Sequence, residues 1–245
     1  MIKLIYADLY RIFRKKSFVG IMIAFFIISY ISCLLGAVGS DMSTASFLDS
    51  LRKYTEKGFV LLLISIPIFL AVYSDEVSSH SMQCIIGRGV TRKKILWAKL
   101  IDSVLLTVIV FTLYMLLQYL MVITTDGLKF SPSQIGAYAA YGLICVLKIV
   151  AAASFSMMVL FITNSIPLGV FCMILFTTIS PNIIRILYLQ GISVMNYSYD
   201  MILIRSMDKL TAGASAWELI PWSAVYILGA WFITYLFFRR KEFDF

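Results

Sequence analysis

The stretch Asp75-Glu-Val-Ser-Ser-His-Ser-Met-Gln-Cys-Ile-Ile-Gly-Arg-Gly-Val-Thr-Arg-Lys-Lys-Ile-Leu-Trp-Ala-Lys99 is a polar, basic segment that lies between two long apolar runs. Residues 77–86 are compatible with a short helix, which Gly87-Arg88-Gly89 would end. Thr91 fits the N-cap of a second helix that continues directly into the next apolar run. The segment therefore predicts a helix–glycine–helix loop on one side of a membrane.

The short helix of this loop carries an apolar knob. Met82, Ile85 and Ile86 are spaced three to four residues apart, so they lie on one face. Two interpretations remain open: the knob rests on the bilayer surface, or it inserts into a groove of a soluble partner and transmits the partner's motion to the spans.

The composition indicates an integral membrane protein. The chain has 245 residues, of which 61% are hydrophobic and 14% charged, and its mean hydropathy is +0.92. Soluble domains are about 45–50% apolar and about 25% charged. The net charge of +8 does not indicate nucleic-acid binding, because the basic residues flank apolar runs, as topology signals do.

The hydrophobic pattern predicts a single all-α membrane domain, residues 1–245, with six transmembrane helices. Crossing about 30 Å of hydrocarbon takes about 20 helical residues. The six predicted spans are residues 18–38, 58–73, 101–123, 136–162, a fifth that begins at 166 and meets Pro181, and 221–238.

Residues 1–17 predict an amphipathic elbow helix that lies on the membrane surface. An apolar stripe occupies one face and the basic residues fall mostly on the other. The stripe consists of Ile2, Ile5, Tyr6, Leu9, Ile12 and Phe13. A frayed basic tail is the alternative.

The basic residues also predict the orientation. Thirteen lysines and arginines belong to the N-terminus, the loop of residues 74–100 and the C-terminus, whereas seven lie in the opposite loops. The positive-inside rule then places both termini and this loop in the cytoplasm. The chain is expected to be a multi-pass protein of the cell membrane, and a bacterial one.

Residues 181–220 form the least regular predicted segment. If the fifth span stopped at Ser180, its 15 residues would reach only about 22 Å. Either the helix kinks through Pro181, or short helices dip back into the outer leaflet, where protein or water covers them. The sequence favours the dipping, re-entrant arrangement.

The motifs of several enzyme classes are absent from the sequence. There is no phosphate loop, no His-Glu-x-x-His and no Gly-x-Ser-x-Gly. One histidine, His80, and four scattered cysteines offer no metal-ligand pattern. We therefore expect a non-enzymatic chain that holds no cofactor and no metal.

Lys148 is the main anomaly inside the predicted spans. It lies roughly 21 Å from the cytoplasmic end of the fourth span, beyond the reach of a lysine stem. Two roles remain open: lining a hydrated conduit where it meets acidic or carbonyl groups of a cargo, or hydrogen bonding to a neighbouring helix. Ser156 and the small residues 151–154 give the same helix a smooth surface that favours close packing.

The loop then shows a resemblance. The run Tyr73-Ser-Asp-Glu76 leaving a span, Ile86-Gly-Arg-Gly-Val-Thr-Arg92, and Lys99 entering the next span resemble the permease subunit of type-2 ABC exporters. Six spans, an elbow helix and a re-entrant segment before the last span are similar to that family's type V architecture. In its small size the chain resembles the members of this family that export antimicrobial or amphipathic peptides, including lantibiotic-immunity and phenol-soluble-modulin exporters.

The resemblance implies partners and contact residues. Two copies of a separately encoded ATPase, which binds ATP and Mg, would bind the coupling loop. The tight turn between spans four and five would form a second, smaller contact with the ATPase. These coupling residues are Glu76, Met82, Ile85, Ile86, Gly87, Arg88, Gly89, Arg92, Thr163 and Asn164. A second permease, identical or different, would complete the complex within membrane lipid. Independently of the resemblance, Lys148 and the nearby Ser156 are assigned to the substrate pathway from their positions in the fourth span.

Three functions are weighed. The leading one is the transmembrane subunit of an ATP-driven exporter of amphipathic or antimicrobial peptides, with lipid, antibiotic or polysaccharide as other cargoes. The second is a membrane anchor or sensor that recruits a cytosolic partner without moving cargo. The third, an intramembrane enzyme, would need a clustered catalytic set that the sequence lacks.

Overall fold

The computed structural model describes residues 2–37, 59–74, 86–87, 89–126, 132–191 and 220–240, and the regular structure within these ranges is entirely helical. In chain order the elements are α1 (Ile2–Arg14), α2 (Lys16–Ala37), α4 (Phe59–Phe69), the π-helical η1 (Leu70–Ser74), α7 (Arg92–Asp126), α8 (Pro132–Thr163), α9 (Ile166–Ile174), the π-helical η2 (Leu175–Ile179), α10 (Ser180–Leu189) and α13 (Ile220–Arg240).

The lengths and composition of these helices are those of a membrane-embedded protein. Three apolar stretches among the described residues are long enough to cross a bilayer: Arg92–Leu120, Tyr138–Thr163 and Ile166–Ile184. Shorter apolar helices occupy Lys16–Ile31, Val60–Ser74 and Ser223–Arg239. Hydrocarbon offers no hydrogen-bond partner to the backbone, so an apolar chain in a membrane satisfies its peptide groups within helices.

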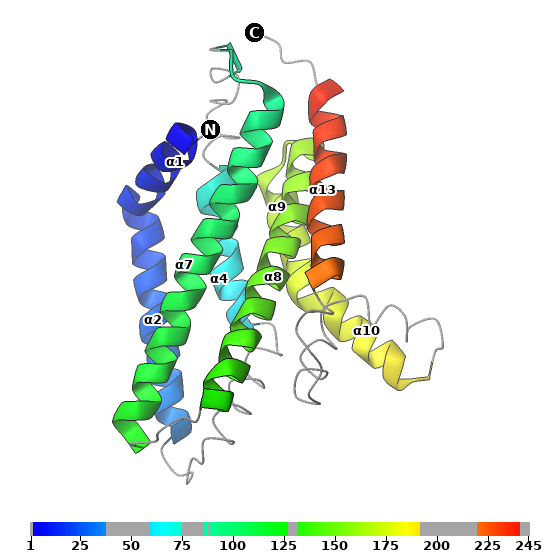
Figure 1. Ribbon diagram of the computed structural model, residues 1–245. Coiled ribbons are helices and arrows are strands. Elements are labelled where there is room, and N and C mark those ends of the chain that lie inside the picture. The colour runs from blue at the N-terminus through cyan, green and yellow to red at the C-terminus, as the bar shows by residue number, and fades with distance from the viewer. Residues whose placement is uncertain are drawn as a thin grey trace.

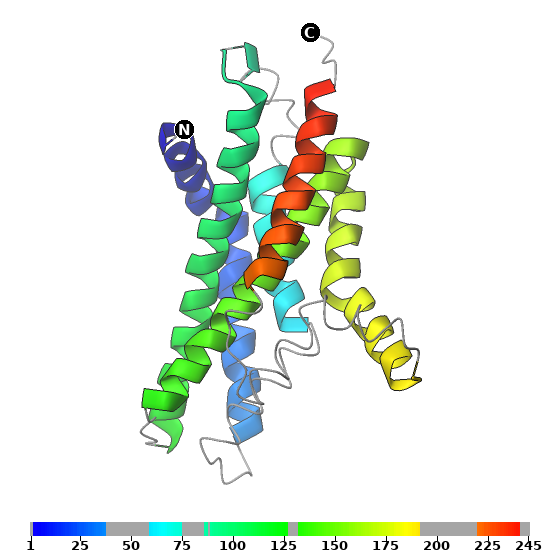
Figure 2. The same ribbon diagram turned by 45° about the vertical axis from the view of Figure 1, so that its right-hand side comes forward.

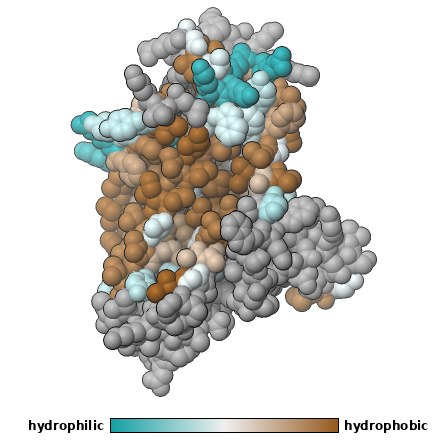
Figure 3. Space-filling model, viewed as in Figure 1, coloured by the Kyte–Doolittle hydropathy of each residue, from teal (hydrophilic) through white to brown (hydrophobic). Residues whose placement is uncertain are grey.

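The helices form an elongated bundle in which α4 is the most enclosed element. α4 packs against α2, α7, α8 and α9, and its Leu61, Ile64 and Ile68 are completely buried. The long helices α7 and α8 run beside it, and α13 lies against α8 (Figure 1). Large apolar side chains such as Leu113 and Leu116 of α7 remain exposed on the outer face, which Figure 3 shows as a broad brown surface below a hydrophilic end.

The N-terminal segment forms a separate short helix before the first apolar run, as the sequence predicts. α1 ends at Arg14 and α2 begins at Lys16, with an angle between the two axes (Figure 1). The residues of the predicted apolar stripe, however, do not all face the same environment. Ile12 is buried against the bundle, whereas Tyr6 and Phe13 are exposed.

The predicted tight turn between the fourth and fifth apolar runs is confirmed. Only Asn164 and Ser165 separate α8 from α9. Asn164 takes a φ of 55°, a left-handed conformation that asparagine tolerates, and its N–H donates to the carbonyl of Leu160 at 2.8 Å. α8 and α9 therefore form an antiparallel hairpin.

Over the residues that the structure describes, the chain follows the alternative in which the helix bends through Pro181, and the re-entrant arrangement stays a prediction. Helix continues through Pro181 to Leu189 instead of ending at Ser180, and Figure 2 shows α10 diverging from the line of α9. Pro181 supplies no N–H to the helix, and the π-helical η2 just before it changes the hydrogen-bond register, which are two recognised causes of a bend. Residues 192–219, the rest of the predicted re-entrant segment, lie outside the described ranges.

A glycine allows α9 to approach α4 and α8 closely. A Cβ placed on Gly169 would lie 2.8 Å from Cζ of Phe69 and 3.4 Å from Cβ of Leu160. Phe69 is itself 1% exposed, so its ring has little room to move. Small residues serve this purpose in membrane helices generally.

Aromatic pairs attach α13 to its neighbours along its length. The ring centroids of Trp97 (α7) and Trp231 (α13) are 4.5 Å apart, and those of Phe161 (α8) and Phe238 (α13) are 5.0 Å apart with perpendicular planes. Such pairs contribute about 0.5–1.5 kcal/mol each beyond their burial.

Gly169→Ala is expected to lower the thermal unfolding midpoint of the purified protein, because overpacking a tight contact costs about 1–3 kcal/mol. Gly229→Ala is the matched control, since a Cβ there meets nothing within 4 Å. Equal midpoints for the two variants would contradict the close approach of α9 to Phe69.

Candidate functional site

A buried ion pair joins the N-terminal helix to the start of α7. The Nζ atom of Lys99 donates to Oδ2 of Asp8 at 2.7 Å, and the two side chains are 1% and 11% exposed. Arg11 lies 3.5 Å from the other oxygen of Asp8. A charge-assisted pair of this length in a buried setting holds its two helices in a fixed relation.

The same turn of α7 is also connected to η1. The hydroxyl of Tyr73, a residue 1% exposed, donates to the carbonyl oxygen of Lys99 at 3.4 Å. Asp102, three residues beyond Lys99, is completely buried. The sequence had suggested Lys99 as a topology signal and as part of the resemblance, not as a member of an ion pair, and Asp8 was missed. The signal that could have found Asp8 is a carboxylate four residues before the buried Ile12, on the same face of an amphipathic helix.

Arg92, one of the predicted coupling residues, closes the C-terminal end of α13. One guanidinium nitrogen, Nη1, donates to the carbonyls of Phe238 at 2.9 Å and Arg239 at 2.7 Å. The guanidinium carbon lies 5.8 Å from the centroid of the Phe238 ring. Helix C-termini present carbonyls without intrahelical partners, and a cation there also complements the helix dipole.

The other predicted coupling residues fall into three groups. Glu76, Met82, Ile85 and Arg88 lie outside the described residues. Ile86 and Gly87 are helical. The N–H of Gly89 donates to the carbonyl of Ile86 at 2.9 Å. Gly89 has a φ of +84°, as a glycine that ends a helix requires. Thr163 and Asn164 are exposed in the α8–α9 turn.

The predicted helix after Thr91 is confirmed, because the carbonyl of Thr91 accepts hydrogen bonds from the N–H groups of Lys94 and Ile95. The start of α7 lies at the hydrophilic end of the molecule, where the C-terminal end of α13 also lies (Figures 1 and 3). Lys93 and Lys94 are exposed there.

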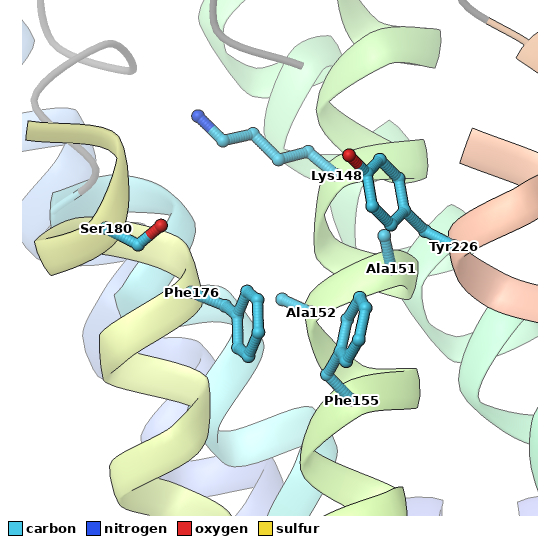
Figure 4. Close-up of a pocket in the computed structure, with 7 residues that line it drawn as sticks. All are labelled: Lys148, Ala151, Ala152, Phe155, Phe176, Ser180 and Tyr226. Carbon is cyan, nitrogen blue, oxygen red and sulfur yellow. The ribbon is translucent and has the colours of Figure 1, made fainter. Parts of the chain in front are cut away.

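A partly open pocket of about 70 Å³ is lined by Lys148, near the middle of α8, and by six other residues. Four of its lining residues belong to α8, one to η2, one to α10 and one to α13: Lys148, Ala151, Ala152, Phe155, Phe176, Ser180 and Tyr226. The rings of Phe155 and Phe176 are stacked, with centroids 4.4 Å apart and planes within 12°. Figure 4 shows the Lys148 side chain above these rings and directed away from them, toward the side of the pocket that carries Ser180.

The structure separates the two residues predicted to line one pathway. Ser156 is completely buried between α8 and α9, where its hydroxyl donates to the carbonyl of Ala152 at 2.9 Å and lies 3.3 Å from the sulfur of Met173. The small residues 151–154 are likewise buried within the chain. Lys148 alone of the predicted pair lines the cavity, so Ser156 has a packing role.

No group of three or more histidine, cysteine or acidic side chains that could hold a metal ion occurs among the described residues. Comparison of the chain with models of protein families found no match, and comparison with curated proteins found no significant one. The function is therefore inferred from the residues and their geometry.

Asp8→Leu is expected to destabilise the protein by about 3–5 kcal/mol, because it removes the carboxylate that is bonded to the buried Lys99. Lys99→Met is expected to cost less, because Arg11 still lies 3.5 Å from Asp8. The double variant is expected to be more stable than either single variant, since it removes both charges. Thermal unfolding in one detergent measures this cycle, with Arg14→Met, which removes an exposed cation of α1, as the control. Strictly additive losses would show that the two residues do not interact.

Arg92→Gln is expected to increase amide hydrogen exchange in the last turn of α13 by about tenfold, since hydrogen bonds from charged groups contribute about 1.5–3 kcal/mol. Lys93→Gln removes an adjacent exposed charge and should leave this exchange unchanged. Arg92→Lys should give an intermediate value, because an ammonium lacks the planar fork of the guanidinium.

Proposed function

We propose that this chain is the transmembrane subunit of an ATP-driven ABC exporter that moves amphipathic or antimicrobial peptides across or out of the cell membrane. ATP would be hydrolysed by a separate subunit, because the sequence has no phosphate loop of its own. The observation that carries the proposal is the anchoring of α7 at the hydrophilic end, directly after the predicted coupling loop, to both α1 and α13.

This anchoring supports a mechanical role for the loop. Arg92 and Lys99 lie seven residues apart, roughly 10 Å along the helix. A displacement of the loop that precedes α7 acts on α13 through Arg92, and on α1 and η1 through Lys99 and Tyr73. A partner that binds the loop can thus move several helices together, as an ATPase must to drive a permease.

The proposed topology has six spans with both termini in the cytoplasm. The three long apolar stretches would each cross once, and the shorter apolar helices of α2, α4–η1 and α13 would supply the other three. The basic residues at the end that holds the chain termini support a cytoplasmic assignment of that end. The exposed Tyr6 and Phe13 of α1 suit the membrane interface.

In this arrangement the ATPase would bind Glu76 and the Met82–Ile86 knob, with Thr163 and Asn164 as a second contact. Two permeases, identical or different, and two ATPases would form the complex. Peptide is preferred as cargo because Lys148, the cation that lines the described pocket, lies beside aromatic and small apolar surface.

Single cysteines test the topology. Lys93→Cys and Thr163→Cys, both exposed in the structure, should react with a membrane-impermeant maleimide only from the cytoplasmic side. Ile135→Cys, exposed near the opposite end of α8, should react only from outside. These variants would be made in a background without the four native cysteines. Labelling of Lys93→Cys from outside would overturn the proposal.

Cargo-stimulated ATP hydrolysis then separates the exporter from the anchor or sensor. The chain would be reconstituted with an ABC ATPase that co-purifies with it, and an amphipathic peptide is expected to raise the hydrolysis rate several-fold. A bound ATPase whose rate no peptide, lipid or antibiotic changes would favour the anchor.

A further inference from the structure

The junction between α1 and α2 presents an aromatic and basic face to the outside of the bundle. Tyr6 and Tyr10 of α1 are 72% and 56% exposed, and Phe13 is 45% exposed. Arg14, the last residue of α1, and Lys16, the first residue of α2, are also exposed. Figure 3 shows hydrophilic side chains at this junction, directly above the brown surface that follows α2.

The junction holds this face in a fixed position. The N–H of Lys15 donates to the carbonyl of Ile12 at 3.1 Å, which continues the hydrogen bonding of α1 up to the bend. The ring of Phe13 lies edge-on to that of Phe18, with centroids 6.5 Å apart. Because Ile12 and Phe18 are 1% and 5% exposed, both helices are packed into the bundle on either side of the bend.

Two hydrogen-bond donors of this face are already joined to each other. Nη1 of Arg14 donates to the hydroxyl oxygen of Tyr10 at 2.9 Å, and the guanidinium carbon lies 5.7 Å from the centroid of the Tyr10 ring. A guanidinium has further N–H groups, and a hydroxyl that accepts one bond can still donate its own hydrogen. The pair is therefore suited to bind the oxygens of a phosphate.

The charges around the junction also favour an anion. Asp8 is the one acidic residue in the sequence of α1 and α2. Its side chain is buried and bonded to Lys99, on a different face of α1 from Tyr10 and Arg14. The exposed face thus combines Arg14 and Lys16 with no acidic side chain of either helix.

An apolar stripe begins directly beyond Lys16. Val19, Ile23 and Ile27 are spaced three to four residues apart, share one face of α2 with Lys16, and are 36%, 53% and 52% exposed. From Lys16 to Ile27 the helix rises roughly 16 Å, which is about half of the ~30 Å hydrocarbon thickness of a bilayer. A cation therefore stands at one end of an apolar surface as long as one leaflet is deep.

We propose that the α1–α2 junction is a binding site for one anionic phospholipid of the phosphatidylglycerol type. Its phosphate binds Arg14 and the hydroxyl of Tyr10, with Lys16 beside it, and an acyl chain lies along the apolar stripe. Phosphatidylcholine suits the site less well, because its choline cation opposes the two basic side chains. The inference goes beyond the proposed function, since it requires a membrane but neither an ATPase nor a cargo.

Native mass spectrometry of the full chain in dodecyl maltoside tests this site by counting bound lipids during a titration. The probes are dioleoyl phosphatidylglycerol and dioleoyl phosphatidylcholine, which have the same acyl chains. Phosphatidylglycerol is expected to bind about tenfold more tightly, because each lysine or arginine strengthens binding to anionic lipid by about fivefold. Glycerol phosphate, which has no acyl chain, is expected not to displace it at equal concentration.

Substitutions assign the preference to the junction. The double variant Arg14→Gln/Lys16→Gln should abolish it, and Tyr10→Phe, which keeps the ring, should reduce it about threefold. Lys93→Gln/Lys94→Gln is the matched control, since it removes two exposed cations from the start of α7 and should leave the preference unchanged. Equal thermal unfolding midpoints in lipid-free detergent establish that all variants are folded.

Three results would overturn the inference. Equal binding of the two lipids by the wild-type chain would exclude recognition of the charge. An equal loss in the Lys93→Gln/Lys94→Gln control would show diffuse attraction by net charge instead of a site. A double variant at Arg14 and Lys16 that binds lipid normally but shifts the ratio of monomer to dimer would show that a second copy of the chain covers this face.

Discussion

A cation enclosed by apolar helices needs compensation from the protein, because hydrocarbon supplies none. This chain encloses such a group at the hydrophilic end of α7, where Lys99 is 1% exposed and bonded to Asp8. The pair explains why α1 lies against the bundle although Tyr6 and Phe13 of the same helix are exposed. Arg92 solves a related problem for α13, whose last carbonyls would otherwise lack partners. The arrangement of α1, α7 and α13 depends on these two cations.

The apolar helices and their boundaries could be predicted from hydrophobic runs, and the α8–α9 turn and the start of α7 after Thr91 from local residue chemistry. These features depend on short-range sequence alone. The course of the chain at Pro181 could be narrowed only to two alternatives, because a proline argues for a break, whereas η2 allows the helix to continue with a bend. Whether all six runs cross the membrane stays a prediction.

The contacts of the candidate site were harder to foresee than its residues. Lys148 and Arg92 were identified because charge is conspicuous in an apolar sequence, but the partner of Arg92 lies 146 residues away. No local periodicity reports such a pairing. Ser156 was assigned to the pathway from its place on α8. In the structure its side chain faces α9 instead, where it contacts Met173. Which face of a buried helix meets a cavity is decided by packing between helices, not by the helix itself.

The α8–α9 hairpin gives the cavity walls unequal freedom. Phe155 and Phe176 are stacked on the two arms of the hairpin, and its short turn and the contact at Gly169 keep the arms together. Tyr226 comes from α13, which joins this region from elsewhere in the sequence and is anchored at its far end by Arg92. A tilt of α13 against the hairpin therefore changes the width of the enclosure while the stacked pair stays intact. A movement of α13 would thus widen or narrow the pocket at Tyr226 without separating Phe155 from Phe176.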